Sequence, residues 1–220
     1  MKLTRFGQSC ILIETKGKRI LVDPGIYHYD DSLLENEWTN IDLILITHKH
    51  QDHCHEEAIK LIMERDNSEL YSTQEVADAR PNLKISVVKQ GDVVEKSGMK
   101  IEVVKAVHGF TPFLKGGNEV NNNVGYIVDD GNKRAYFVGD SICFDNDYKC
   151  DIIFVPICNH GLVMSPFEAG LFSKETEAEI VVPYHYESPK FPGDLDKVKE
   201  EFDKQGLNYK ILGLKESIEI

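Results

Sequence analysis

Residues 43–53 read Leu43-Ile44-Leu45-Ile46-Thr47-His48-Lys49-His50-Gln51-Asp52-His53, an apolar run that leads directly into three histidines and an aspartate. The apolar run predicts a buried strand, which places the polar residues on the loop before the next helix. Neutral imidazoles and carboxylates are the ligands that zinc, manganese and iron accept, and ligands so closely spaced can serve two ions. A chance match to this spacing has a probability of roughly 10⁻³ across the sequence, which favours a metal site over solvated surface histidines.

The rest of the chain alternates short apolar runs with helical patterns. Helices are predicted near 55–65, over 74–79 and near 195–204, and a further helix begins at Ser165-Pro166-Phe167-Glu168, which combines an N-cap, a first-turn proline and a capping-box glutamate. Strands are predicted at residues 10–13, 19–22, 43–46, 85–88, 101–104, 125–128, 136–138, 152–155, 180–182 and 209–212. A meander followed by helices occurs twice, so we expect one domain over residues 1–220, of the α+β class, with two sheets face to face and helices outside.

The net charge and the cysteine content argue against several classes of protein. Lys and Arg total 25 and Asp and Glu total 37, so the net charge is −12. A surface of this charge repels polyanions, and we expect no nucleic-acid partner. The sequence shows neither a signal-peptide pattern nor a membrane span, which predicts a cytoplasmic protein. The five cysteines are widely spaced and contain no Cys-x-x-Cys pair, so we expect reduced thiols rather than a disulfide framework or a zinc ribbon.

Along almost its entire length, the sequence resembles the metallo-β-lactamase-fold superfamily of metal-dependent hydrolases. In chain order, that family has an aspartate after a buried strand, the histidine cluster, a histidine at a strand end, a bridging aspartate and a final histidine. The matching residues here are Asp23, His48, His50, Asp52, His53, His108, Asp140 and His185. The resemblance implies a four-layer αββα sandwich.

The resemblance also implies a ligand set for two divalent ions, zinc first, with manganese and iron as alternatives. One ion would be held by His48, His50 and His108, and the other by Asp52, His53 and His185, with Asp140 between them. Asp23 would orient ligand imidazoles through hydrogen bonds, although an aspartate before Pro-Gly also suits a turn. Two such ions would hold a shared water as hydroxide and polarise a carbonyl or phosphoryl oxygen.

Other features bear on the branch and on the substrate. Residues 3–10 and 182–186 look like the compact branch that contains ascorbate-phosphate lactonase and N-acylphosphatidylethanolamine phospholipase D, whose members often carry His where this chain has Gln8. The loop 109–123 could contact substrate or be a plain solvated loop. Its candidate substrate residues are Lys115, Asn121, Asn122 and Asn123. Asp52 and His160 are the candidate catalytic side chains.

These features together predict a binuclear hydrolase that cleaves an ester, lactone or phosphodiester bond of a small substrate, phosphorylated or not. A redox di-iron protein on the same fold is one alternative, but that class typically has a carboxylate at the position of His50 and an additional electron-transfer domain. A nuclease of the tRNA-processing type is another, which the net charge of −12 disfavours. A metal-binding module without turnover is the third. The sequence is compatible with a homo-oligomer.

Overall fold

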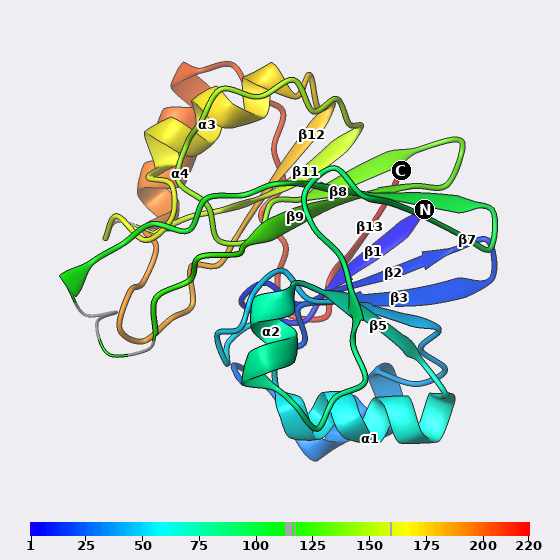
Figure 1. Ribbon diagram of the computed structural model, residues 1–220. Coiled ribbons are helices and arrows are strands. Elements are labelled where there is room, and N and C mark those ends of the chain that lie inside the picture. Colours follow the sequence, from blue (N-terminus) through cyan, green and yellow to red (C-terminus); the bar gives the residue numbers. More distant parts are fainter. Residues whose placement is uncertain (113–115, 117, 159) are drawn as a thin grey trace.

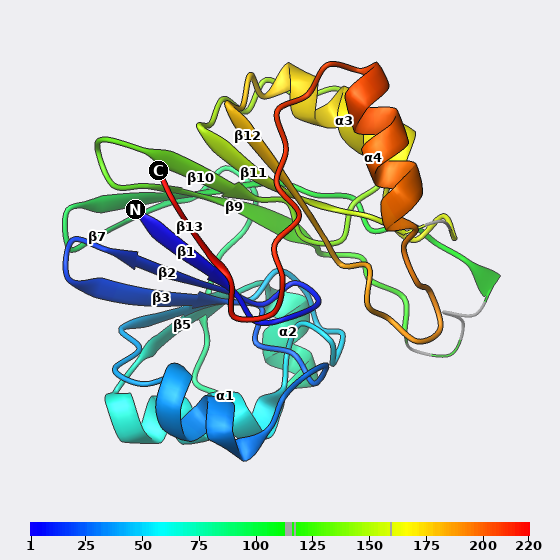
Figure 2. The same ribbon diagram turned by 180° about the vertical axis from the view of Figure 1, so that it is seen from behind.

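Two β-sheets packed face to face form the body of the molecule, and helices cover both outer faces (Figures 1 and 2). The computed structural model describes residues 1–112, 116, 118–158 and 160–220. The helices α1 (Glu56–Asp66) and α2 (Gln74–Ala79) lie outside the first sheet, and α3 (Pro166–Glu175) and α4 (Leu195–Lys204) lie outside the second. The predicted four-layer αββα sandwich is therefore confirmed.

The first sheet has seven strands in the order β13-β1-β2-β3-β4-β5-β6. Its strands are β1 (Lys2–Arg5), β2 (Ile11–Thr15), β3 (Lys18–Val22), β4 (Leu43–Leu45), β5 (Glu69–Ser72), β6 (Ser86–Val87) and β13 (Ser217–Glu219). The strands from β3 to β6 run parallel to one another. A short π-helical segment, η1 (Leu33–Glu37), lies in the connection between β3 and β4.

The second sheet has six strands in the order β12-β11-β10-β9-β8-β7. Its strands are β7 (Val93–Lys96), β8 (Met99–Lys105), β9 (Val124–Asp129), β10 (Arg134–Phe137), β11 (Ile152–Pro156) and β12 (Ile180–Tyr184). The last three run parallel. Because the carboxyl ends of parallel strands meet at one edge of a sheet, the loops after β10 and β12 come out on the same edge.

Side chains that alternate along the strands fill three separate apolar layers. On β4, Leu43 and Leu45 point into the core between the sheets, whereas Ile44 packs against the layer beneath α1. On β11, Ile152 and Phe154 enter the same central core, whereas Ile153 and Val155 face α3 and α4. A strand buried on both faces reads as a continuous apolar run, which explains the pattern that leads into the histidine cluster.

The chain ends differ from the sequence prediction. The strand predicted over residues 209–212 is wrong, because Tyr209 forms only an isolated bridge to Val181. The final strand is β13, which pairs antiparallel with β1 at the edge of the first sheet and brings the two termini side by side (Figures 1 and 2). The strands β1, β5, β7 and β13 were not predicted, since they are short and each carries polar residues among the apolar ones.

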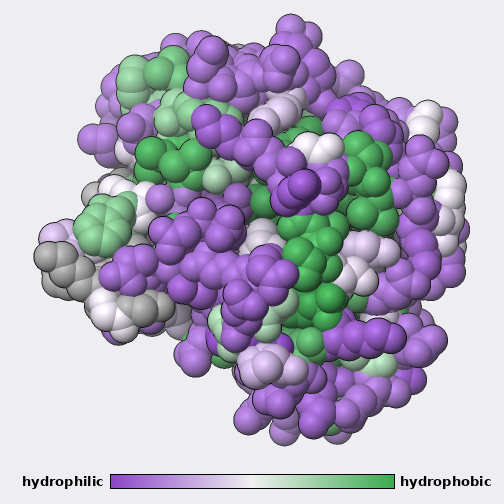
Figure 3. All heavy atoms as spheres, viewed as in Figure 1, coloured by the Kyte–Doolittle hydropathy of each residue, from purple (hydrophilic) through white to green (hydrophobic). Residues whose placement is uncertain are grey.

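The surface is mostly hydrophilic, with a hydrophobic band between the two sheets and a smaller hydrophobic group near α3 and α4 on the face drawn in Figure 3. Val87 of β6 and Val93 of β7, on the last strands of the two sheets, are 48% and 49% exposed. None of the helices among the described residues combines the length and the apolar character needed to cross a membrane.

Candidate metal centre

Seven side chains from four separate loops converge at one edge of the sandwich. The cluster after β4 supplies His48, His50, Asp52 and His53, while His108 follows β8, Asp140 follows β10 and His185 follows β12. The possible ligand atoms form two groups, within each of which all atoms lie within 4.8 Å of one another. One group is His48, His50, His108 and Asp140; the other is Asp52, His53 and His185. The structure thus brings together all seven residues that the sequence singled out as metal ligands.

Asp140 lies between the two groups. Its Oδ1 is 3.1 Å from the Nε2 atoms of both His53 and His185. Its Oδ2 is 3.5 Å from His108 Nε2 and 3.9 Å from His48 Nε2. Each carboxylate oxygen therefore faces histidines of a different group, which is the placement expected of a side chain shared by two cations. Gly139 precedes it with a φ of +70°, a backbone conformation that favours glycine.

A buried hydrogen-bond network orients His48 and His53. Asp23 Oδ2 accepts a hydrogen bond from the hydroxyl of Thr47 and lies 2.8 Å from His53 Nδ1. The Thr47 hydroxyl, having donated to Asp23, accepts from His48 Nδ1 at 3.0 Å. Both imidazoles consequently carry a proton on Nδ1 and direct Nε2 toward the centre. Asp23 has the orienting position that the sequence predicted for it.

Backbone carbonyls orient the other two histidines of the first group. His108 Nδ1 donates to the carbonyl of Gly109 at 2.6 Å, which leaves Nε2 to face Asp140. His50 has the opposite orientation: its Nε2 donates to the carbonyl of Asn118 at 2.8 Å, and its Nδ1 lies 3.1 Å from His48 Nε2. The contact with Asn118 carries no sequence signal, because any residue could supply that carbonyl.

The donor atoms at the centre suit a metal ion. Several of them are buried and form no hydrogen bond among the described residues, although they lie close to one another: His53 Nε2, His108 Nε2, His185 Nε2 and Asp140 Oδ1. Buried polar atoms are nearly always hydrogen-bonded, so a converging set of imidazole and carboxylate atoms without hydrogen bonds is unusual. Divalent cations satisfy such atoms, and imidazole nitrogen with carboxylate oxygen is a donor set typical of zinc.

Burial and neighbouring charges set the protonation of the cluster. Burial, reinforced by the charge of His53, holds the pKa of His48 well below its usual value, so this imidazole is in the neutral form that binds metals. Burial opposes ionisation of Asp140, but His185 and His53 outweigh it and hold the pKa of the carboxyl well below its usual range. Burial also disfavours a charged His185, yet Asp140 and Asp52 raise its pKa to about 9. A cation that binds there at neutral pH displaces this proton.

The backbone around the centre is tightly constrained. Gln8, Asp23 and His185 have left-handed φ values of +42°, +46° and +62°. Such conformations are uncommon for residues other than glycine and concentrate at functional sites. Gly25 packs directly on the cluster loop, because a Cβ atom there would lie 1.8 Å from the carbonyl oxygen of Asp52. Only glycine fits at that position.

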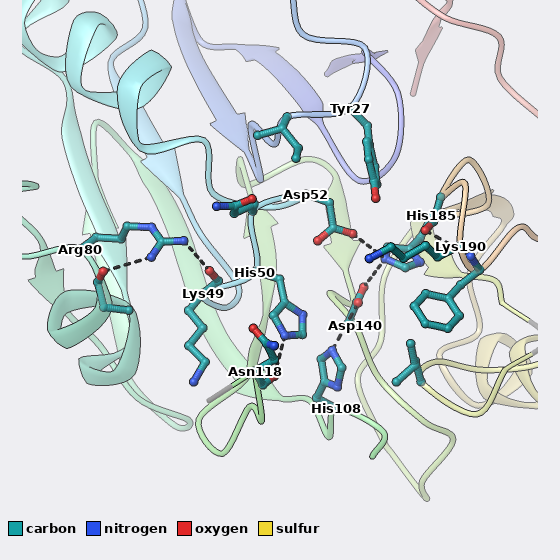
Figure 4. Close-up of a pocket in the computed structure, with 16 residues that line it drawn as sticks. Tyr27, Lys49, His50, Asp52, Arg80, His108, Asn118, Asp140, His185 and Lys190 are labelled. Carbon is teal, nitrogen blue, oxygen red and sulfur yellow. Dashed lines mark hydrogen bonds and ion pairs between the residues drawn. The ribbon is translucent and has the colours of Figure 1, made fainter. Parts of the chain in front are cut away.

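A cavity of about 1000 Å³ opens onto the two groups (Figure 4). Its wall includes three cations, Lys49, Arg80 and Lys190. The ammonium of Lys49 is 2.9 Å from a carboxylate oxygen of Glu75, and Arg80 donates to the carbonyl of Lys49 at 2.9 Å. Lys190 forms no ion pair within the described part of the chain. The sequence did not single out these residues, since they come from segments far apart in the chain.

The remaining predicted site residues that the structure describes are not among the two groups of possible ligands. His160 is exposed, and its ring stacks edge-on against Phe191, 5.4 Å between centroids, so it touches a wall residue of the cavity rather than the cluster. The backbone N–H groups of Asn121 and Asn122 donate to Glu75 Oε2 at 3.0 and 2.7 Å. The side-chain amide of Asn123 donates to the carbonyl of Asp140. Lys115 lies outside the described residues.

Comparisons with known proteins agree with this geometry. A family model described as a beta-lactamase superfamily domain matches residues 2–185. A "UPF0173 metal-dependent hydrolase" of Korarchaeum cryptofilum is 31% identical and covers 98% of this chain and 96% of its own length. One of Listeria monocytogenes is 31% identical over the full length of both chains. The solved structure of Igni18, a metallo hydrolase from Ignicoccus hospitalis, has a TM-score of 0.80 at 26% identity and covers 99% of this chain and 97% of its own.

The predicted superfamily is thereby confirmed, while the placement next to ascorbate-phosphate lactonase stays a prediction. The family model spans Asp23 and the whole ligand set, from His48 to His185. The match therefore includes every residue of the two groups. On these grounds the chain belongs to the beta-lactamase superfamily domain family and is a metal-dependent hydrolase of the metallo-β-lactamase fold.

Proposed function

We propose that the centre holds two divalent ions, zinc in the first place, and that the chain hydrolyses a small anionic ester, lactone or phosphodiester. The observation that carries the two-ion assignment is the division of the ligand atoms into two groups with Asp140 facing both. His48, His50 and His108 would hold one ion, and Asp52, His53 and His185 the other. Manganese and iron accept the same ligands and are the alternatives to zinc.

The chain's own residues account for most of the arrangement that hydrolysis needs. Two bound divalent ions supply a water nucleophile at neutral pH and polarise the oxygen of the bond to be cleaved. Asp23 and Thr47 keep the imidazoles of His48 and His53 in the orientation that presents Nε2. Asp52, whose side chain is 21% exposed on the cavity wall, remains the candidate to receive a proton during turnover.

The positive charges on the cavity wall favour an anionic substrate. The molecule has a net charge of −12, yet Lys49, Arg80 and Lys190 all line the cavity. Figure 4 shows Lys190 and the hydroxyl of Tyr27 directed toward the Asp52 and His185 side of the centre. A cation without an ion-pair partner, in a wall that also faces two metal ions, favours a phosphate or carboxylate group on the substrate over a neutral one.

The proposal is tested by measuring kcat/KM on phosphodiesters, lactones and thioesters, each offered in an anionic form and a matched neutral form. Asp52→Ala and His185→Ala are expected to lower turnover of every substrate to background while the protein stays folded. Lys190→Met is expected to lower kcat/KM by about fivefold on the anionic form alone, the effect of one exposed ion pair. Lys89→Met, an exposed lysine outside the cavity, is the matched control. Wild-type activity in either ligand variant refutes the ligand assignment, and an equal loss on both substrate forms refutes the anionic substrate.

A further inference from the structure

Gln8 is not among the ligand residues, but it contacts one of the two groups directly. It is buried, and its side-chain Nε2 donates to Asp52 Oδ2 at 3.1 Å. Its backbone carbonyl accepts from the N–H of His185 at 3.1 Å. Asp52 and His185 belong to the same group, the one assigned to the second ion. Within the described chain, no hydrogen bond joins Gln8 to His48, His50 or His108.

Gln8 is itself held in one orientation. Its Oε1 accepts from the backbone N–H of Glu187 at 3.2 Å, and its own backbone N–H donates to the Glu187 carboxylate. That carboxylate also pairs with Arg5, whose side chain is 1% exposed. The Arg5 guanidinium in turn donates to the carbonyl of Leu212 at 3.1 Å and lies over the ring of Tyr186. Because a backbone N–H can only donate, Oε1 must face Glu187 and the NH₂ end of the amide must face Asp52.

This orientation has consequences for Asp52. Its carboxylate is 21% exposed on the cavity wall, so rotation of the side chain is not blocked by packing alone. The bond from Gln8 fixes Oδ2 beside His185 Nε2, 3.4 Å away. An amide donor also leaves the negative charge of Asp52 in place for a cation, whereas a lysine or arginine there would neutralise it.

We propose that Gln8 is a positioning residue that sets the affinity of the second metal site and leaves the first site unaffected. This rests on the two-ion assignment made above. Gln8 would act through Asp52 and through the backbone of His185, without touching the ion or the substrate. Residues that orient metal ligands typically change affinity about 10- to 100-fold when they are replaced.

The test is a competitive zinc titration of the metal-free protein that resolves two dissociation constants. Two variants remove the bond to Asp52 in different ways. Gln8→Met keeps the length of the side chain without the amide. Gln8→Asn keeps the amide one carbon shorter, and asparagine tolerates the left-handed backbone at this position. Gln90→Met, at an exposed turn away from the cavity, is the matched control.

The expected result is that the dissociation constant of the second site rises about 10-fold or more in both Gln8 variants, with the first changed less than about twofold. The variant His185→Ala lacks a ligand of the second site and therefore identifies the dissociation constant of the first site. In the double variant with His185→Ala and Gln8→Asn, that dissociation constant is expected to be the same as in His185→Ala alone. If both dissociation constants are unchanged in a folded Gln8→Asn protein, or if both sites weaken equally, Gln8 does not have the proposed role. Either result leaves the two-ion assignment standing. Wild-type protein that binds one zinc overturns both.

Discussion

Thr47 belongs to neither group of possible metal ligands, yet its hydroxyl connects the two groups. Its hydroxyl joins the Asp23 carboxylate to the imidazole of His48, and the same carboxylate contacts His53. All these residues are buried. The Thr47 hydroxyl therefore determines the tautomer of His48 in the first group, and the aspartate to which it donates also orients His53 in the second group.

Replacing Thr47 with valine keeps the shape of the side chain and removes that hydroxyl. We expect zinc affinity to fall about 10- to 100-fold. We also expect the free energy of unfolding to fall by about 1–3 kcal/mol, because the Nδ1–H of His48 loses its acceptor in a buried position. Zinc titration and urea unfolding measure the two effects. Thr15→Val is the control, since its hydroxyl donates to Asp130 far along the chain from the cluster. Equal zinc affinity in Thr47→Val and wild type would contradict the orienting role.

At this scale the sequence predicts the ligands and the orienting aspartate Asp23, but not the other residues that orient the ligands. The spacing of His48, His50, Asp52 and His53 is itself a signal, and the strand-end placement of His108 and His185 follows from the family resemblance. Gln8 lies 44 positions from the aspartate that it contacts. Asn118 acts through its backbone carbonyl. Neither contact leaves a trace in local sequence, because both depend on how distant loops meet.

Elements are predicted well where local chemistry sets their ends. The helix α3 begins where the sequence places it, because the hydroxyl of Ser165 accepts from the N–H of Glu168 while the Glu168 carboxylate accepts from the N–H of Ser165. The strand β13 has no comparable signal. It has only three residues, two of them polar, and it exists because β1 offers it an edge. Long-range pairing of this kind cannot be read from a short segment alone.

The helix start gives a prediction at the same scale. Ser165→Ala is expected to lower the free energy of unfolding by about 1 kcal/mol, the usual effect of losing an N-cap. The zinc content should not change, since α3 packs on the outer face of the second sheet. Ser32→Ala is the matched control, because Ser32 precedes η1 without a side-chain capping bond. Urea unfolding measures the free energy of unfolding, and metal analysis of the same samples measures the zinc content. A loss of zinc in Ser165→Ala would contradict this prediction and show that the start of α3 and the metal centre are coupled.

For the whole molecule, the centre connects the two halves of the sandwich. The first sheet and its loop supply His48, His50, Asp52 and His53, whereas the second sheet supplies His108, Asp140 and His185. The sequence predicts this two-sheet arrangement from the repeated order of its elements. It does not predict the cations of the cavity wall, because Lys49, Arg80 and Lys190 come together only after both sheets have packed.

Ions that bridge the two sheets should stabilise the folded state. An ion that binds only the folded chain adds about 4 kcal/mol when its free concentration is 1,000 times the dissociation constant. We therefore expect a chelator to lower the Tm by about 10 °C, since each kcal/mol shifts the Tm of a chain of this size by about 2–4 °C. Added zinc should restore the Tm, and magnesium should not, because it prefers oxygen ligands. A Tm that does not respond to the chelator would mean that the sheets hold together without the ions.

The two-ion centre is tested most directly by counting the metal ions per chain by inductively coupled plasma mass spectrometry, on protein purified without chelators. The geometry of the two groups predicts about two zinc or manganese ions per chain in the wild type and about one in His185→Ala. Iron at the same occupancy would favour the redox class over hydrolysis. A folded wild-type chain that takes up no metal on reconstitution would contradict the account.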